Sequence, residues 1–168
     1  MKQNKAFTLI EMMVVVGSLA FIFMMVVGIL INSVKSSRKI NVTDSVEQDG
    51  TWVIAELRKN LLKAGITGLN CPSGVGSSLS FTSRIDGGTT YLVCNESESL
   101  IASVSAESAV NLLSSEVRAS GCNNFVSCDL SSFFPIVNFS FTLSKGDESS
   151  GVENYNERDF EATVVVRE

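Results

Sequence analysis

The sequence predicts an α+β fold in which one long N-terminal helix packs on an antiparallel β-sheet. Residues 7–31 form an apolar run with a single ionisable side chain, Glu11. Apolar residues then recur at helical spacing to about residue 64, and beyond residue 66 they alternate at a spacing of two. We therefore expect a helix with a membrane-spanning first half and an amphipathic second half, followed by strands.

The apolar run is the most informative segment for function. As a helix, its 25 residues would extend about 38 Å, enough to cross a hydrocarbon core of about 30 Å. A carboxylate inside such a span costs about 2.5 to 3.5 kcal/mol, so Glu11 predicts a cationic partner. A secretory signal peptide has a shorter apolar core and ends at small residues, which residues 31–35 match poorly. We expect the span to be retained.

The residues that flank the run bear on its orientation. Residues 1–6 contain two lysines and no acid, which is typical of a leader on the cytoplasmic side. Three bases, Lys35, Arg38 and Lys39, follow the run and by count favour the opposite orientation. Residues 1–6 and the motif that follows them decide the expected topology, with the leader on the cytoplasmic side.

The segment from Lys5 to Val16, KAFTLIEMMVVV, resembles the class III signal of type IV pilins and type II secretion pseudopilins. The resemblance implies that a prepilin peptidase cuts between Ala6 and Phe7 and that the new Phe7 amine is N-methylated. The family usually has glycine before the cut, where this chain has Ala6. The resemblance also implies that Glu11 neutralises the Phe7 amine of a neighbouring subunit during filament assembly. That amine is the cation that the energetic argument requires.

This resemblance implies a structural subunit, a minor pilin or pseudopilin, and not an enzyme. Its partners would be other pilin or pseudopilin subunits, the prepilin peptidase, the assembly platform with its ATPase, and membrane lipid before assembly. The chain would lie in the bacterial cytoplasmic membrane with its C-terminal domain outside, and then in a pilus or a periplasmic or extracellular filament. Residues 56–65 are similar to the helix end of larger minor pilins and J-type pseudopilins.

We expect four segments along the chain: a leader (1–6), a transmembrane or filament-core helix (7–31), an amphipathic continuation (32–65) and a disulfide-bonded antiparallel β domain (66–168). Gly50 is a candidate bend in the helix. Gly17 and Gly28 fit two interpretations equally, local loosening of the helix or close packing against another helix. The continuation should bury one apolar face, made of Val42, Val46, Val53, Ile54, Leu57 and Leu61.

Strand patterns follow residue 66. The turn signal Asp86-Gly87-Gly88 separates candidate strands at 79–85 and 90–93, and further candidates lie at 100–104, 112–118, 137–143 and 160–166. The last two alternate most cleanly and could cover the amphipathic helix. Their expected buried residues are Val137, Phe139, Phe141, Leu143, Phe160, Ala162, Val164 and Val166.

Four cysteines lie in the expected exported part, which indicates disulfides formed in an oxidising compartment. Four cysteines allow three connectivities. Cys122 with Cys128 would close a small loop and leave Cys71 with Cys94, and we favour this pairing. A zinc site is disfavoured because the chain has no histidine and no CxxC spacing.

Composition weakens the other classes of function. Without histidine, the chain cannot form a Ser-His-Asp or Cys-His arrangement, and we expect no cofactor. The net charge of -5 gives no support to direct nucleic-acid binding. Carboxylate-only catalysis stays open. Residues 145–159 read as a solvated acidic loop, with weak candidate calcium ligands at Asp147, Glu148, Glu153 and Asp159.

Two other classes of protein fit the N-terminal pattern. One is a single-pass membrane-anchored extracytoplasmic binding or sensor domain that never assembles. The other is a secreted disulfide-bonded protein whose whole apolar run is removed. The three alternatives differ in their mature N-terminus, which is Phe7, Met1 or a residue beyond Ile31.

Overall fold

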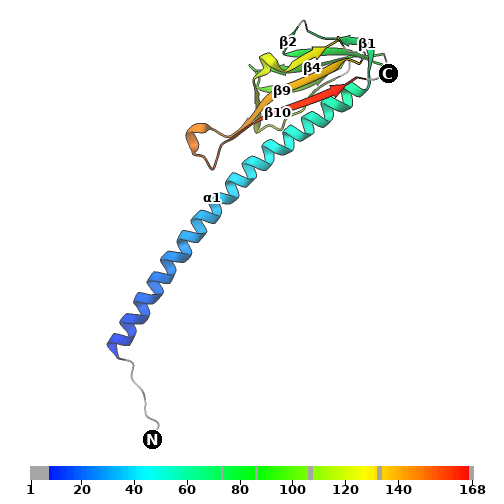
Figure 1. Ribbon diagram of the computed structural model, residues 1–168. Coiled ribbons are helices and arrows are strands. Elements are labelled where there is room, and N and C mark those ends of the chain that lie inside the picture. The colour runs from blue at the N-terminus through cyan, green and yellow to red at the C-terminus, as the bar shows by residue number, and fades with distance from the viewer. Residues whose placement is uncertain (1–7, 73, 86, 106–107, 132–133, 167–168) are drawn as a thin grey trace. The chain divides into compact units, whose positions relative to one another are not determined.

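The computed structural model describes residues 8–72, 74–85, 87–105, 108–131 and 134–166. One long helix, α1 (Leu9–Leu62), precedes a set of strands, and every strand pair within these residues is antiparallel (Figure 1). The chain divides into two compact units, one up to Arg38 and one from Lys39, and α1 contributes residues to both. The predicted α+β class, with a long N-terminal helix and antiparallel strands, is confirmed.

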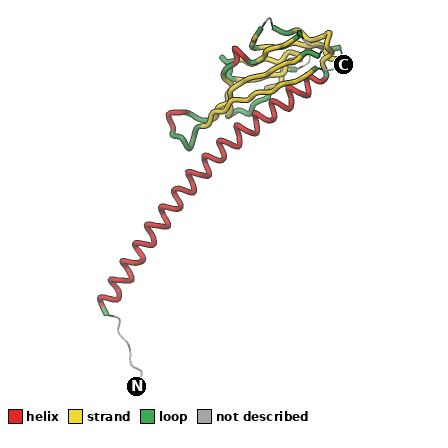
Figure 2. The backbone as a smooth tube through the Cα atoms, in the orientation of Figure 1, coloured by secondary structure: helices red, strands yellow, loops and turns green. Residues whose placement is uncertain are grey.

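The strands form two sheets where the sequence predicted one. The first has the order β1-β3-β4-β5-β6, and the second has the order β10-β9-β8-β2, with β7 also paired to β9 (Figure 2). The bounds are β1 (Ala64–Asn70), β2 (Val75–Gly76), β3 (Ser78–Ser83), β4 (Thr89–Asn95), β5 (Leu100–Val104), β6 (Ala109–Asn111), β7 (Val117–Ser120), β8 (Val126–Asp129), β9 (Ile136–Lys145) and β10 (Asn156–Val165). Two short 3-10 helices, Cys122–Asn124 and Glu148–Ser150, complete the elements of the described residues.

Most of the expected strands are present. The hairpin of β3 and β4 and the strand β5 lie where the alternation predicted them. The expected strand at 112–118 is present only at its end, where Val117 and Arg118 begin β7, because the chain turns between β6 and β7. The Leu112 amide donates to the Ile101 carbonyl, and the Leu113 amide donates to the Asn111 side chain. Both leucines are buried by this turn instead of alternating along a strand.

The hairpin of β9 and β10 forms one face of the core. Its register runs from Asn156 opposite Lys145 to Val165 opposite Ile136. The stacked rings of Phe141 and Phe160 have centroids 5.6 Å apart. All eight inward residues predicted for these strands are buried, together with residues of α1 and of the first sheet, in one hydrophobic cluster.

The second half of α1 lies along this core. Val46, Val53, Leu57 and Leu61 are buried, as the amphipathic pattern predicted, whereas Val42 is half-buried. The helix α1 continues without a break through Gly50, the candidate bend. Gly50 is buried, and a methyl group built on it would overlap the Phe160 ring. This glycine therefore permits close approach of the helix and β10.

The helix ends at Leu62, and β1 begins at Ala64. The Lys63 amide donates to the Asn60 carbonyl, and the Lys63 carbonyl accepts from the Arg84 amide. The backbone at the end of β3 thus satisfies one of the carbonyl groups left without a partner at the helix end.

All four cysteines form disulfides, but the favoured pairing is wrong. Cys71 bonds to Cys128 and Cys94 bonds to Cys122, with Cα–Cα distances of 6.1 and 5.2 Å. The reason lies in the two sheets: Val75 of β2 pairs with Ser127 of β8, which brings the segment after β1 beside Cys128. Cys94 and Cys122 are both buried in the shared core. One bridge therefore joins the residue after β1 to β8, and the other joins β4 to the 3-10 helix that precedes β8.

Candidate membrane and assembly segment

Thr8 and Glu11 form a reciprocal cap at the N-terminus of α1. The Thr8 backbone amide donates to Glu11 Oε2 at 3.1 Å, and the Thr8 hydroxyl donates to the same oxygen at 3.2 Å. In return, the Glu11 amide donates to Thr8 Oγ1 at 3.3 Å. This is the capping box, which satisfies two amides that would otherwise lack partners at a helix start.

The cap gives Glu11 a role that the sequence interpretation missed. The signal was present, because Thr8-Leu9-Ile10-Glu11 has the S/T-x-x-E spacing of a capping box immediately before an apolar run. Both Thr8 donors use Oε2. The other carboxylate oxygen, Oε1, makes no hydrogen bond within the described chain. The predicted processing residues, Ala6 and Phe7, lie outside the described residues.

An exposed apolar surface follows the cap. Within the first unit, from Leu9 to Ile31, the large apolar side chains are between 42% and 77% exposed. By length and composition, α1 is the one helix in the described ranges that could cross a membrane. Such a surface is stable in lipid or against other apolar helices and unfavourable in water. These residues are Leu9, Ile10, Met12, Met13, Val14, Val15, Val16, Leu19, Phe21, Ile22, Phe23, Met24, Met25, Val26, Val27, Ile29, Leu30 and Ile31.

The two glycines of this segment stand in open space. A methyl group built on Gly17 or Gly28 would meet no atom within 4 Å apart from the local backbone. The Ser18 hydroxyl donates to the Val15 carbonyl at 2.9 Å, so it needs no partner from outside the helix. The two interpretations of the glycines, loosening and close packing, therefore both remain predictions.

The candidate calcium ligands of the acidic segment do not converge on one site. The Asp147 carboxylate accepts from the Ser149 amide and hydroxyl, and Asp159 accepts from the Thr142 hydroxyl at 2.6 Å. No group of three or more Asp, Glu or Cys side chains that could hold a metal ion occurs among the residues described. The segment is a hairpin connection that contains a short 3-10 helix, Glu148–Ser150.

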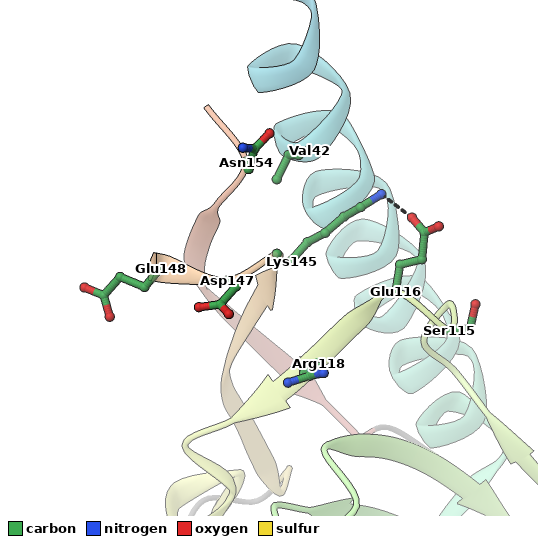
Figure 3. A pocket seen from close by; sticks show the side chains of 9 residues that line it. Val42, Ser115, Glu116, Arg118, Lys145, Asp147, Glu148 and Asn154 are labelled. Carbon is green, nitrogen blue, oxygen red and sulfur yellow. Dashed lines mark ion pairs between the residues drawn. The ribbon is translucent and has the colours of Figure 1, made fainter. Parts of the chain in front are cut away.

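A polar pocket of about 620 Å³ lies beside this connection (Figure 3). Lys145 crosses it and pairs with Glu116 at 2.5 Å, and its ammonium also donates to the Ser45 hydroxyl at 2.9 Å. The Lys145 ion pair lowers the pKa of the Glu116 carboxyl. The lining residues are Val42, Ser115, Glu116, Arg118, Lys145, Gly146, Asp147, Glu148 and Asn154.

The pKa values of two other groups in this region are shifted by their neighbours. Hydrogen bonds from Ser149 lower the pKa of the Asp147 carboxyl. The Tyr155 hydroxyl donates to Glu157 at 2.6 Å, and this bond raises the pKa of Tyr155 to about 12. Both bonds are local, within two residues, and they stabilise the connection between β9 and β10.

Comparison with known proteins returns no relative. No model of a known protein family matches the chain, and neither a curated protein nor a solved structure matches it.

Proposed function

We propose that this chain is a structural subunit of a type IV pilus or a type II secretion-like filament, as a minor pilin or pseudopilin. The observation that carries the proposal is the exposed apolar surface from Leu9 to Ile31. Its one carboxylate, Glu11, lies in the first helical turn. Lipid would cover this surface before assembly, and the same segments of neighbouring subunits would cover it afterwards.

The proposed assembly has three steps. A prepilin peptidase removes residues 1–6 and leaves Phe7 with a free amine, which is then methylated. The processed chain waits in the cytoplasmic membrane with its disulfide-bonded unit outside. An assembly platform and its ATPase then extract it into a helical filament, where Glu11 offsets the positive charge of a neighbour's Phe7 amine.

The geometry of the cap supports this role for Glu11. The carboxylate lies beside the Thr8 amide, so it is one residue away from the amine that cleavage at Phe7 would create. Because both Thr8 donors bind Oε2, Oε1 has the acceptor capacity for an ammonium group from a second chain. A cap alone needs no negative charge, since glutamine serves in a capping box as well.

Mass spectrometry of the N-terminus tests the proposal. Chains isolated from filament or membrane fractions should begin at a methylated Phe7. An intact Met1 in filament preparations would contradict the proposal and would locate the failure at Ala6. A start beyond Ile31 would identify a secreted protein.

One observation favours a second candidate, the membrane-anchored binding or sensor domain. The pocket beside Lys145 is large enough for a small polar ligand and has side chains of both charges (Figure 3). This candidate predicts an intact Met1 in membranes and no chain in filaments. The same N-terminal analysis therefore separates the two.

A further inference from the structure

A groove at the C-terminal end of α1 combines exposed apolar and cationic side chains. It has a volume of about 500 Å³ and is lined by Lys59, Leu62, Lys63, Arg84 and Ile85. Leu62 is 64% exposed and Ile85 is 80% exposed. Lys59 pairs with Glu56, but Lys63 and Arg84 have no side-chain ion pair in the described part of the chain. The groove therefore has apolar surface and two cations that pair with no carboxylate among the described residues.

The groove is lined by basic residues, although the unit that contains it is acidic overall. From Lys39 to the C-terminus the sequence contains 17 acidic and 9 basic residues. Three of those nine basic residues line the groove. A partner that fits it would present an apolar side chain with carboxylates around it, because like charges would repel.

The connection between β9 and β10, residues 146–155, has that character. Val152 is 78% exposed. Asp147, Glu148 and Glu153 surround it in the sequence, and the connection contains no basic residue. A valine at a loop tip, flanked by carboxylates, complements a groove in which Leu62 and Ile85 are flanked by cations.

Within one chain, this connection cannot reach the groove. The Lys39 ammonium donates to the Tyr155 carbonyl at 2.6 Å, which fixes the connection beside the start of this part of the helix. Lys59 to Lys63 come 20 to 24 residues later, which is about 30 to 36 Å along the helix. Figure 1 shows the C-terminal end of α1 and the connection, drawn in orange, at opposite ends of the unit that begins at Lys39. A contact between them must join two chains.

We infer that this groove binds the β9–β10 connection of a second copy of the chain. Val152 of one copy packs on Leu62 and Ile85 of the next, and Glu148 and Glu153 face Lys63 and Arg84. Because the contact uses different surfaces of the two copies, it is head-to-tail, and a head-to-tail contact that does not close into a ring continues as an open helix. The inference rests on the proposed function and adds the residues by which the exported units meet.

Charge reversal tests the contact in the full-length chain in cells that assemble it. Lys63→Glu with Arg84→Glu should lower the amount of chain in the filament fraction on the order of tenfold, and so should Glu148→Lys with Glu153→Lys. The four changes together should restore incorporation, because the attraction is re-formed with opposite signs. As a matched control, Glu96→Lys with Glu98→Lys changes an exposed acidic pair on the β4–β5 turn and should leave incorporation unchanged.

Engineered cysteines give a second test. A chain with Ile85→Cys and Val152→Cys should form a ladder of disulfide-linked multimers on mild oxidation, since each copy contributes one cysteine to each contact. A product that stops at the dimer would overturn the open head-to-tail arrangement. The chain with Val152→Cys alone is the control and should give no ladder.

The failure of this contact and the failure of the proposed function have different signatures. Filaments that contain the doubly substituted chain with Phe7 at its N-terminus, but give no ladder and tolerate the charge reversals, would overturn the contact alone. Chains that keep Met1 and never enter filaments would overturn the proposed function, and with it the contact.

Discussion

The ring of Phe160 on β10 lies directly against the backbone of Gly50 on α1. A methyl group built on Gly50 would overlap this ring, although other glycines of the helix stand in open space. Phe160 cannot easily move aside, because its ring also stacks on Phe141 within the hydrophobic cluster. The helix therefore approaches the second sheet this closely because residue 50 has no side chain.

We expect Gly50→Ala to destabilise the β unit. Forcing a methyl group into a packed core costs typically about 1 to 3 kcal/mol, and the gain in helix propensity returns about 1 kcal/mol. The net loss should be up to about 2 kcal/mol, measured by urea unfolding of the full chain in detergent. Thr51→Ala, at an exposed neighbouring position, is the control and should change stability little.

A second substitution identifies the ring as the cause. If the overlap with Phe160 is responsible, Gly50→Ala should cost less in a Phe160→Leu background than in the native chain. Equal costs in the two backgrounds would show that the helix, and not its contact with β10, responds to the substitution.

The disulfide pairing gives a second prediction. Digestion without reduction should release peptides that link Cys71 to Cys128 and Cys94 to Cys122. The bridges span 57 and 28 residues, for which the chain-entropy model gives about 4 and about 3.5 kcal/mol. Paired serine substitutions at either bridge should therefore destabilise the unit by several kcal/mol. A peptide that links Cys71 to Cys94 would contradict the structure.

The Tyr155–Glu157 hydrogen bond predicts a loss of stability at alkaline pH. The pKa of Tyr155 is raised from 10.0 to about 12. The unfolded phenol ionises near pH 10, whereas the folded one stays protonated toward pH 12. The stability that this bond contributes is therefore complete below pH 10 and is lost as the pH rises through 12.

Ultraviolet titration of the phenol can check this shift. The chain has two tyrosines, so a Tyr91→Phe background isolates the Tyr155 transition. Glu157→Gln in that background should return the pKa of Tyr155 toward 10, because the first cause of the shift is the bond to this carboxylate. A transition that stays at pH 12 in the Gln variant would assign the shift to other groups.

The sequence predicted the elements whose periodicity is strong. The alternation at 137–143 and 160–166 predicted β9, β10 and their buried faces, and the helical spacing predicted the buried face of α1. It did not predict β1, β2 or β8. β1 contains two glycines, β2 has two residues, and β8 has the short sequence Val-Ser-Cys-Asp. Such strands form because of the pairing that neighbouring strands offer, and that pairing has no local signal.

Contacts between distant residues have no local signal either. At Gly50 the sequence shows that a side chain is missing but not that the Phe160 ring lies against this position. The cysteine pairing depended on a division into two sheets that local spacing does not encode. At the candidate assembly site, the apolar neighbours of Glu11 indicate that its charge needs a partner. Its capping role depends instead on Thr8, three residues earlier.

The final prediction separates the two roles of Glu11. Glu11→Gln keeps an acceptor for the Thr8 amide, so the cap should survive, but it removes the negative charge. We expect the Gln variant to insert in the membrane and to enter filaments on the order of tenfold less than the native chain, because an ammonium buried in an apolar filament core needs a counter-charge. Glu11→Ala and Glu11→Val should be at least as defective.

Thr8→Ala is the matched control for this prediction. It removes the hydroxyl of the cap, at a cost of about 1 kcal/mol in helix stability, and leaves the carboxylate in place. We expect it to enter filaments nearly as well as the native chain. If Thr8→Ala blocks incorporation and Glu11→Gln does not, then Glu11 serves the start of its own helix, and the counter-charge argument for assembly is wrong.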